Sequence, residues 1–105
     1  MTDKKIILST TGSREEAQKI ARALVDRKLA ACVNIVGPIE STYRWQGTVE
    51  SSEEFLLVIK TTAAACERVR ELIHKLHSYQ LPECVQLSIE DGLPQYLEWI
   101  GESVE

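Results

Sequence analysis

The stretch from Leu29 to Thr62 constrains the fold of this chain more than any other part of the sequence. On both sides of Gln46-Gly47, apolar residues alternate with polar ones, which is typical of β-strands. The pair Gln46-Gly47 is itself typical of a tight turn between two strands. The stretch therefore predicts a long antiparallel hairpin.

The length of this hairpin predicts that it projects from its own domain. Each arm has about 15 residues, which span about 50 Å at roughly 3.3 Å per residue. A chain of this size forms a globule with a radius of gyration of about 13 Å and a diameter near 33 Å. The tip, with Tyr43 and Trp45, is thus expected to be covered by another subunit. An uncovered ribbon is the alternative, but an isolated two-stranded ribbon is only marginally stable in water.

The register of the hairpin predicts a β-bulge. Counting outward from the two-residue turn places Val33 opposite Lys60, which matches an apolar residue with a charged one. One extra residue at Gly37-Pro38 instead pairs Val33 with Ile59 and Cys32 with Lys60. Glycine and proline inside a strand are expected at bulges.

The remaining segments complete the order of elements. Ser13 begins a capping-box pattern, and apolar residues at helical spacing follow it. In the last strand, Val85, Leu87 and Ile89 alternate with polar residues and are expected to point inward. The predicted segments are a strand over 5–10, a helix over 14–28, a second helix from Thr62 to about 77, a strand over 84–89 and a short helix over 93–100.

This order predicts one α+β domain over residues 1–105, a ferredoxin-like βαββαβ sandwich with the long hairpin protruding and an extra C-terminal helix. Both helices of the βαββαβ unit then cover the same face of a four-stranded antiparallel sheet. The opposite face carries Cys32, Val36 and Val58 and needs a cover, which a partner subunit would supply.

Composition limits the classes of partner. The net charge is −4 with the signs well mixed, so neither nucleic acid nor an anionic membrane is expected as a partner. An RNA recognition module shares the order of elements, but the central strands, 6–10 and 55–60, offer a single phenylalanine for stacking. No apolar run is long enough to span a bilayer, no signal region precedes the first strand, and the three cysteines have no paired spacing. The expected location is the cytoplasm.

Two small groups of residues are candidates for chemistry. The bulge makes Cys32 and Lys60 cross-strand neighbours, and an adjacent ammonium can activate a thiol. This suggests an enzyme as the alternative function, although an inert cysteine beside a solvated lysine is the more common arrangement. His74 and His77 lie three residues apart on the second helix and suit copper, nickel or zinc, but no third ligand accompanies them. No sequence motif of a known enzyme class is present, so catalysis is not expected.

Five motifs, in order along nearly the whole chain, resemble those of the CutA family of divalent-cation tolerance proteins. They are Leu29–Val36 (LAACVNIV), Tyr43–Gly47 (YRWQG), Ile59–Thr61 (IKT), His77–Glu83 (HSYQLPE) and Tyr96–Ile100 (YLEWI). The resemblance implies a ferredoxin-like homotrimer, similar to the PII signalling proteins, with clefts between subunits. It also implies a role in tolerance of copper and other divalent cations, as a binding or regulatory module.

The resemblance also supplies candidate site residues. The matching positions are Cys32, Tyr43, Trp45, Lys60, His77, Tyr79 and Glu83. We expect Cys32, Lys60, His77, Tyr79 and Glu83 to line a cleft between subunits that binds a small anionic ligand or a divalent cation, with Tyr43 and Trp45 at the oligomer interface.

The sequence departs from the family at its metal ligands. The usual His-Pro-Tyr-Glu reads His77-Ser-Tyr-Gln80, which lacks a proline and a carboxylate. The copper ligands proposed in some relatives are a first-strand cysteine and a histidine doublet. Here Ser9 and Leu76 stand at two of these positions, so only His77 remains. A divalent copper or zinc ion is therefore expected to bind weakly.

Overall fold

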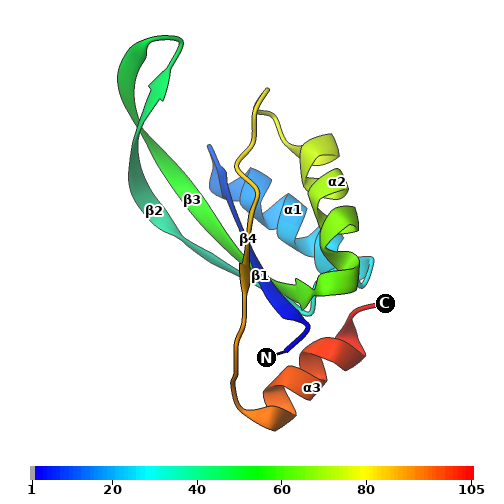
Figure 1. The fold of residues 1–105 in the computed structure, drawn as a ribbon. Helices are drawn as coiled ribbons and strands as arrows, with labels where there is room; N and C mark the ends of the chain where they lie inside the picture. Colours follow the sequence, from blue (N-terminus) through cyan, green and yellow to red (C-terminus); the bar gives the residue numbers. More distant parts are fainter. Residues whose placement is uncertain (1) are drawn as a thin grey trace.

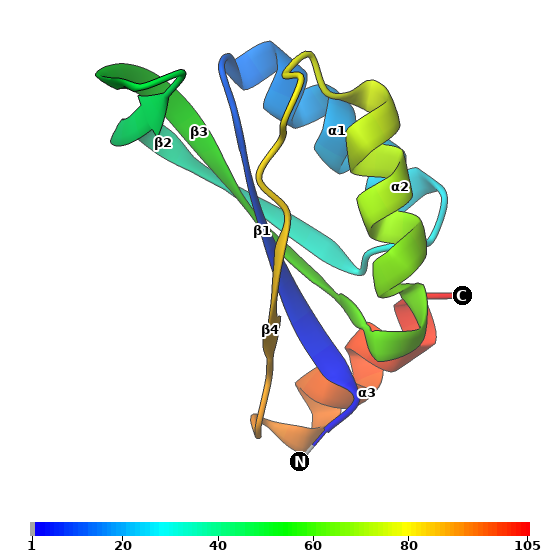
Figure 2. The same ribbon diagram turned by 45° about the horizontal axis from the view of Figure 1, so that its top comes forward.

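The computed structural model describes residues 2–105 and confirms the ferredoxin-like α+β fold. Its sheet has the order β2-β3-β1-β4 with antiparallel pairing throughout. Helices α1 and α2 lie on one face of the sheet, and α3 lies beside the end where β1 begins (Figures 1 and 2). The elements are β1 (Lys4–Thr11), α1 (Arg14–Asp26), β2 (Cys32–Trp45), β3 (Thr48–Thr62), the 3-10 helix η1 (Ala63–Ala65), α2 (Cys66–Leu76), β4 (Val85–Ser88) and α3 (Pro94–Ser103).

The predicted cap begins α1, and a left-handed residue ends it. The Ser13 hydroxyl accepts a hydrogen bond from the Glu16 amide at 3.1 Å. At the other end, Lys28 has φ 58°, so the helix ends before the predicted residue 28. The amide of Leu29 returns to the carbonyl of Leu24 at 2.9 Å, which is the pattern of a Schellman cap.

The hydrophobic core lies between the two helices and the sheet. Cys66, Val69, Leu72 and Ile73 of α2 are buried. The 3-10 helix η1 precedes α2, so the α-helix begins at Cys66 and not at the predicted Thr62. The α1 face and the inner face of the sheet complete the core. Its fully buried members include Ile7, Ala17, Leu24, Leu57, Ile59, Val69 and Ile73.

The hairpin has the predicted register. Val33 pairs with Ile59 and Cys32 with Lys60, and the register shifts at Gly37-Pro38, which is a cis peptide. Gln46 and Gly47 have φ angles of 51° and 82°, as a type I′ turn requires.

The hairpin forms one end of an elongated molecule (Figure 1). The longest extent of the molecule is 44 Å, and its radius of gyration is 14.1 Å. The expected reach of about 50 Å per arm was too long, because strands twist and coil and a bulge bends them.

The expected orientation of β4 was wrong. Val85 and Leu87 pair with Leu8 and Ile6 and are each 48% exposed, whereas Gln86 pairs with Ile7 on the helix side. Alternation correctly separated the two faces of the strand, but it did not identify which face the helices cover. Here the apolar side chains of β4 lie on the face without helices.

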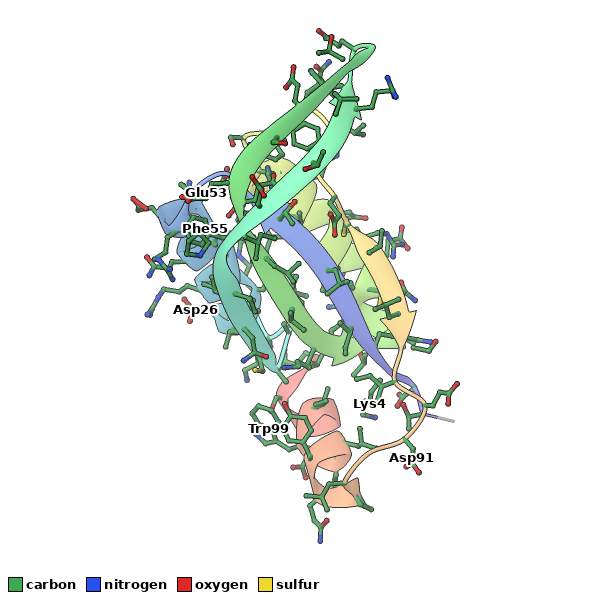
Figure 3. The ribbon with its side chains drawn as sticks, turned by 90° about the vertical axis from the view of Figure 1, so that its left-hand side faces the viewer. Lys4, Asp26, Glu53, Phe55, Asp91 and Trp99 are labelled. Carbon is green, nitrogen blue, oxygen red and sulfur yellow. The ribbon has the colours of Figure 1, made fainter. Side chains whose placement is uncertain are left out.

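We refer to this face of the sheet as the uncovered face (Figure 3). All four strands contribute apolar side chains to it, and these side chains lie on the side of the sheet opposite α1 and α2. The strand pairing assigns to this face the apolar residues Ile6, Leu8, Val36, Leu56, Val58, Val85 and Leu87. A continuous apolar surface of this kind typically marks an interaction site.

Candidate functional site

A pocket of about 770 Å³ lies between the distal half of the hairpin and the loop that follows α2. We refer to it as the hairpin pocket. Strand β1 contributes one residue to it, and the rest come from the hairpin and the loop. The lining residues are Thr10, Ser41–Tyr43, Trp45, Glu50, Glu54 and Tyr79–Glu83.

His77 fixes the start of this loop. Its Nε2 lies 2.6 Å from the carbonyl oxygen of Thr10, and its Nδ1 accepts a hydrogen bond from the Tyr79 amide at 3.0 Å. Because Nδ1 accepts, Nε2 must carry the proton and donate. Both ring nitrogens of this buried imidazole are therefore used within the fold, and a metal ion could bind only by displacing one of these bonds.

A second anchor holds the loop to α1. The Glu16 carboxylate accepts two hydrogen bonds from Ser78, from its amide at 2.7 Å and from its hydroxyl at 3.1 Å. The loop wall of the hairpin pocket is thus fixed by side chains from two elements.

Tyr79 and Glu54 connect the loop to the hairpin. The Tyr79 hydroxyl donates to Oε2 of Glu54 at 2.7 Å, and Glu54 is only 7% exposed. Burial raises the pKa of Tyr79 well above its usual range, and the hydrogen bond to Glu54 and the charge of that carboxylate raise it further. Tyr79 therefore remains a neutral donor to a buried carboxylate.

The hairpin pocket is acidic and aromatic. Glu50, Glu54 and Glu83 contribute carboxylates, and its lining contains no lysine, arginine or histidine. Within residues 2–105, no group of three or more His, Cys, Asp or Glu side chains is arranged to hold a metal ion. The carboxylates therefore surround the pocket without forming a chelating cluster.

The structure places the predicted site residues in two separate groups. Tyr43, Trp45, Tyr79 and Glu83 line the hairpin pocket, with Tyr43 and Trp45 40% and 38% exposed. Lys60 is six residues along β3 from the pocket's buried carboxylate, which corresponds to about 20 Å. One chain alone does not bring the two groups together.

The second group lies at the foot of the hairpin. The Lys60 ammonium donates to Oδ1 of Asn34, and the Cys32 thiol donates to the same oxygen at 3.8 Å. On α3, burial and the adjacent Cys32 raise the pKa of Tyr96, whose ring packs against that of Trp99 with 5.4 Å between centroids. Figure 3 shows Trp99 at this end of the sheet.

The sequence did not identify Glu50 and Glu54 as site residues. The motifs that supplied the candidate site residues do not include these two glutamates. One signal was available for Glu54, because it directly precedes the apolar run 55–59, and a carboxylate that is buried next to such a run needs a partner. Its partner, Tyr79, lies far along the chain, so the pairing depends on the tertiary fold.

Together, the fold and the site define a class of protein: a ferredoxin-like sandwich with an overlong hairpin and an acidic pocket beside the hairpin tip. Comparison with known proteins gives the family. Residues 5–103 match the family model described as CutA1 divalent ion tolerance protein. The chain belongs to the CutA1 family.

Individual relatives match over nearly their whole length. The divalent-cation tolerance protein CutA of Thermus thermophilus is 46% identical over 99 residues, which cover 94% of this chain and 96% of that protein. The crystal structure of CutA from Xylella fastidiosa is 39% identical with a TM-score of 0.97, covering 99% of this chain and 100% of the other. The structure of the periplasmic divalent cation tolerance protein CutA from Archaeoglobus fulgidus is 42% identical with a TM-score of 0.94, covering 97% and 99%.

The structure also bears on membrane association and on the thiols. Within residues 2–105, none of the helices is both long and apolar enough to cross a membrane. The three cysteines are free, and burial raises the pKa of both Cys66 and Cys84. Those two thiols are therefore held in the unreactive protonated form.

Proposed function

We propose that this protein contributes to tolerance of divalent metal ions as a homotrimeric, ligand-binding regulatory module similar to the PII proteins. The names of its relatives support the link to divalent cations. The observation that carries the assembly is the uncovered face, an apolar surface drawn from all four strands from which the exposed hairpin tip projects. Further copies of the chain would bury both the uncovered face and the hairpin tip.

Assembly would also join the two groups of site residues. We propose that Cys32 and Lys60 of one chain meet Tyr79 and Glu83 of a neighbour in an intersubunit cleft, since pockets favour such boundaries. The acidic lining of the hairpin pocket means that a small anion would depend on Lys60 for its positive partner. Isothermal titration with phosphate tests this: binding that is lost in Lys60→Ala supports the shared cleft, and unchanged binding contradicts it.

The proposed metal binding is weak. The bonds made by both nitrogens of His77 and the serine at position 9 support this, because neither arrangement offers a free strong ligand. Titration calorimetry with copper and zinc should give dissociation constants above about 1 μM, where binding free energies are modest. Submicromolar binding that survives His77→Ala would show that other residues hold the ion.

The cellular role can be tested directly. In a bacterial strain sensitised to copper by loss of its own CutA1-family gene, this chain should restore growth, and Trp45→Arg should not. We place the action in the cytoplasm, where three free thiols are stable. Failure of the unaltered chain to restore growth, despite normal expression, would contradict the proposed role.

A catalytic role remains the alternative hypothesis. The shared contact of Cys32 and Lys60 with Asn34 is the feature that favours it. A Cys32→Ala variant that restores growth as well as the unaltered chain would argue against catalysis, whereas a turnover-dependent adduct on this thiol would support it.

A further inference from the structure

We propose that the residues at the foot of the hairpin bind a small aromatic anion, a carboxylate or phosphate group carried on a planar ring. The inference rests on the proposed intersubunit cleft and names the class of ligand that this cleft takes. Cys32 is the first residue of β2, and Lys60 stands two residues before the end of β3, so both lie at the rim of the uncovered face. A ligand bound there lies at the boundary between subunits and not in the middle of their contact.

The first argument comes from the surroundings of Lys60. Its cross-strand partners are Ile6 and Cys32, so this half-buried side chain lies on the uncovered face among apolar neighbours. None of the ion pairs within residues 2–105 includes Lys60. When another subunit closes the face, the ammonium loses more of its water, which is costly unless an opposite charge accompanies it. A bound anion supplies that charge.

The second argument comes from Asn34, which adds hydrogen-bond donors beside this charge. Its Oδ1 accepts from the Lys60 ammonium and, at 3.8 Å, from the Cys32 thiol. Because both donors meet the oxygen, the orientation of the amide is fixed, and its N–H groups are not used in these bonds. The ammonium likewise keeps further N–H groups to donate. A positive charge with additional donors beside it suits the oxygens of a carboxylate or a phosphate.

The third argument comes from two aromatic rings on α3. The rings of Tyr96 and Trp99 are tilted by 37° to each other and remain 42% and 41% exposed. Tyr96 lies beside Cys32, since burial and then this thiol raise the pKa of its phenol. Trp99 lies at the same end of the sheet (Figure 3). Exposed rings beside a group of donors favour a ligand with a planar body, because offset and edge-to-face contacts between rings are stabilising.

Three fluorinated probes test the charge and the ring separately. 4-Fluorobenzoate carries both, trifluoroacetate carries the charge without a ring, and 4-fluorobenzyl alcohol carries the ring without a charge. Each would be titrated into the 105-residue chain and followed by fluorine NMR. 4-Fluorobenzoate should saturate its site below about 10 mM, a reasonable affinity for so small a ligand. The other two probes should bind at least about tenfold more weakly, because each lacks one part of the interaction.

Variants test the position of each part. Lys60→Gln removes the charge and should weaken 4-fluorobenzoate binding by about tenfold or more. Trp99→Leu removes a ring but keeps an apolar side chain, so it should weaken 4-fluorobenzoate binding by about fivefold and leave phosphate binding unchanged. Glu98→Gln is the matched control, because Glu98 is exposed and lies on the side of α3 away from Tyr96. Melting curves and light scattering would confirm that each variant folds and assembles.

The outcomes separate this inference from the proposed cleft. If phosphate binds through Lys60 but 4-fluorobenzoate binds no more tightly than trifluoroacetate, the aromatic class is overturned and the cleft is still supported. Binding of 4-fluorobenzoate that Trp99→Leu leaves unchanged has the same meaning. Absence of binding by both anions contradicts the cleft as well, and points to Glu83 of a neighbouring chain as the charge that neutralises Lys60. The comparison of probes uses only the unaltered chain, so it decides the class of ligand even where a variant does not assemble.

Discussion

At the scale of single residues, the hydrogen bond between Tyr79 and Glu54 should contribute measurably to stability. Tyr79→Phe leaves a buried carboxylate without its donor and should lower the free energy of unfolding by about 1–3 kcal/mol. Tyr43→Phe is the matched control, because the Tyr43 hydroxyl forms an exposed hydrogen bond with the Ser52 hydroxyl. Chemical denaturation of both variants gives the comparison. A Tyr79→Phe cost no greater than that of Tyr43→Phe would contradict this assignment.

The same tyrosine should make stability depend on alkaline pH. Its pKa is raised in the folded chain, mainly by burial. Below about pH 10, the ordinary pKa of tyrosine, the phenol is protonated in both states and its contribution is complete. Above that pH, the unfolded chain loses the proton first, so stability should fall as pH rises. The melting temperature of the unaltered protein should therefore drop more steeply than that of Tyr79→Phe between about pH 10 and 11. Parallel curves would contradict the shifted pKa.

Lys28 occupies a backbone conformation that glycine adopts more readily. Its φ of 58° ends α1, and a left-handed residue other than glycine costs about 1–2 kcal/mol. Lys28→Gly should therefore stabilise the protein by about 1 kcal/mol, since glycine is the preferred residue at this cap position. Arg27→Gly, at φ −87°, is the control and should destabilise it. Thermal melts of both variants would show whether the signs differ.

At the scale of elements, the bulge in β2 allows no side chain at Gly37. A Cβ there would lie 2.7 Å from a ring carbon of Phe55 and 3.1 Å from the carbonyl oxygen of Glu54. Arg14 at the start of α1 also contacts this region, with its guanidinium 4.8 Å from the Phe55 ring centre and donating to the Gly37 carbonyl. The bulge is thus held between the hairpin and α1.

Gly37→Ala should therefore destabilise the fold by about 1–3 kcal/mol, as overpacking does. Gly92→Ala is a suitable control, because a Cβ there would meet only ordinary contacts of 3.4–3.7 Å with Leu97. It should change the free energy of unfolding by less than about 0.5 kcal/mol. Guanidinium denaturation of the two variants provides the measurement. Equal costs would indicate that the bulge can widen freely.

Prediction from the sequence succeeded where neighbouring strands constrain one another. Only one extra residue at Gly37-Pro38 matches apolar with apolar partners along the hairpin, so the bulge and register followed from the pattern. The orientation of β4 was not predicted correctly, because Val85 and Leu87 alternate in the same way whichever face the helices cover. The partner of Glu54 depends on a contact between distant segments, which no local pattern encodes.

At the scale of the whole molecule, the uncovered face and the exposed hairpin tip share one explanation. Burial of apolar area contributes about 25 cal/mol per Å², so the apolar residues of four strands give a strong drive to associate. Trp45, 38% exposed beside the turn, would serve as an aromatic anchor on a neighbouring subunit. Replacing it with arginine would put a charge into that contact and favour dissociation.

Light scattering of the purified protein at micromolar concentration tests this assembly most directly. We predict a mass about three times the 11.8 kDa of one chain, and a lower mass for Trp45→Arg with its secondary structure retained. The control Glu98→Gln should keep the mass of the unaltered protein. A mass of one chain for the unaltered protein would contradict the proposed homotrimer and the intersubunit cleft that depends on it.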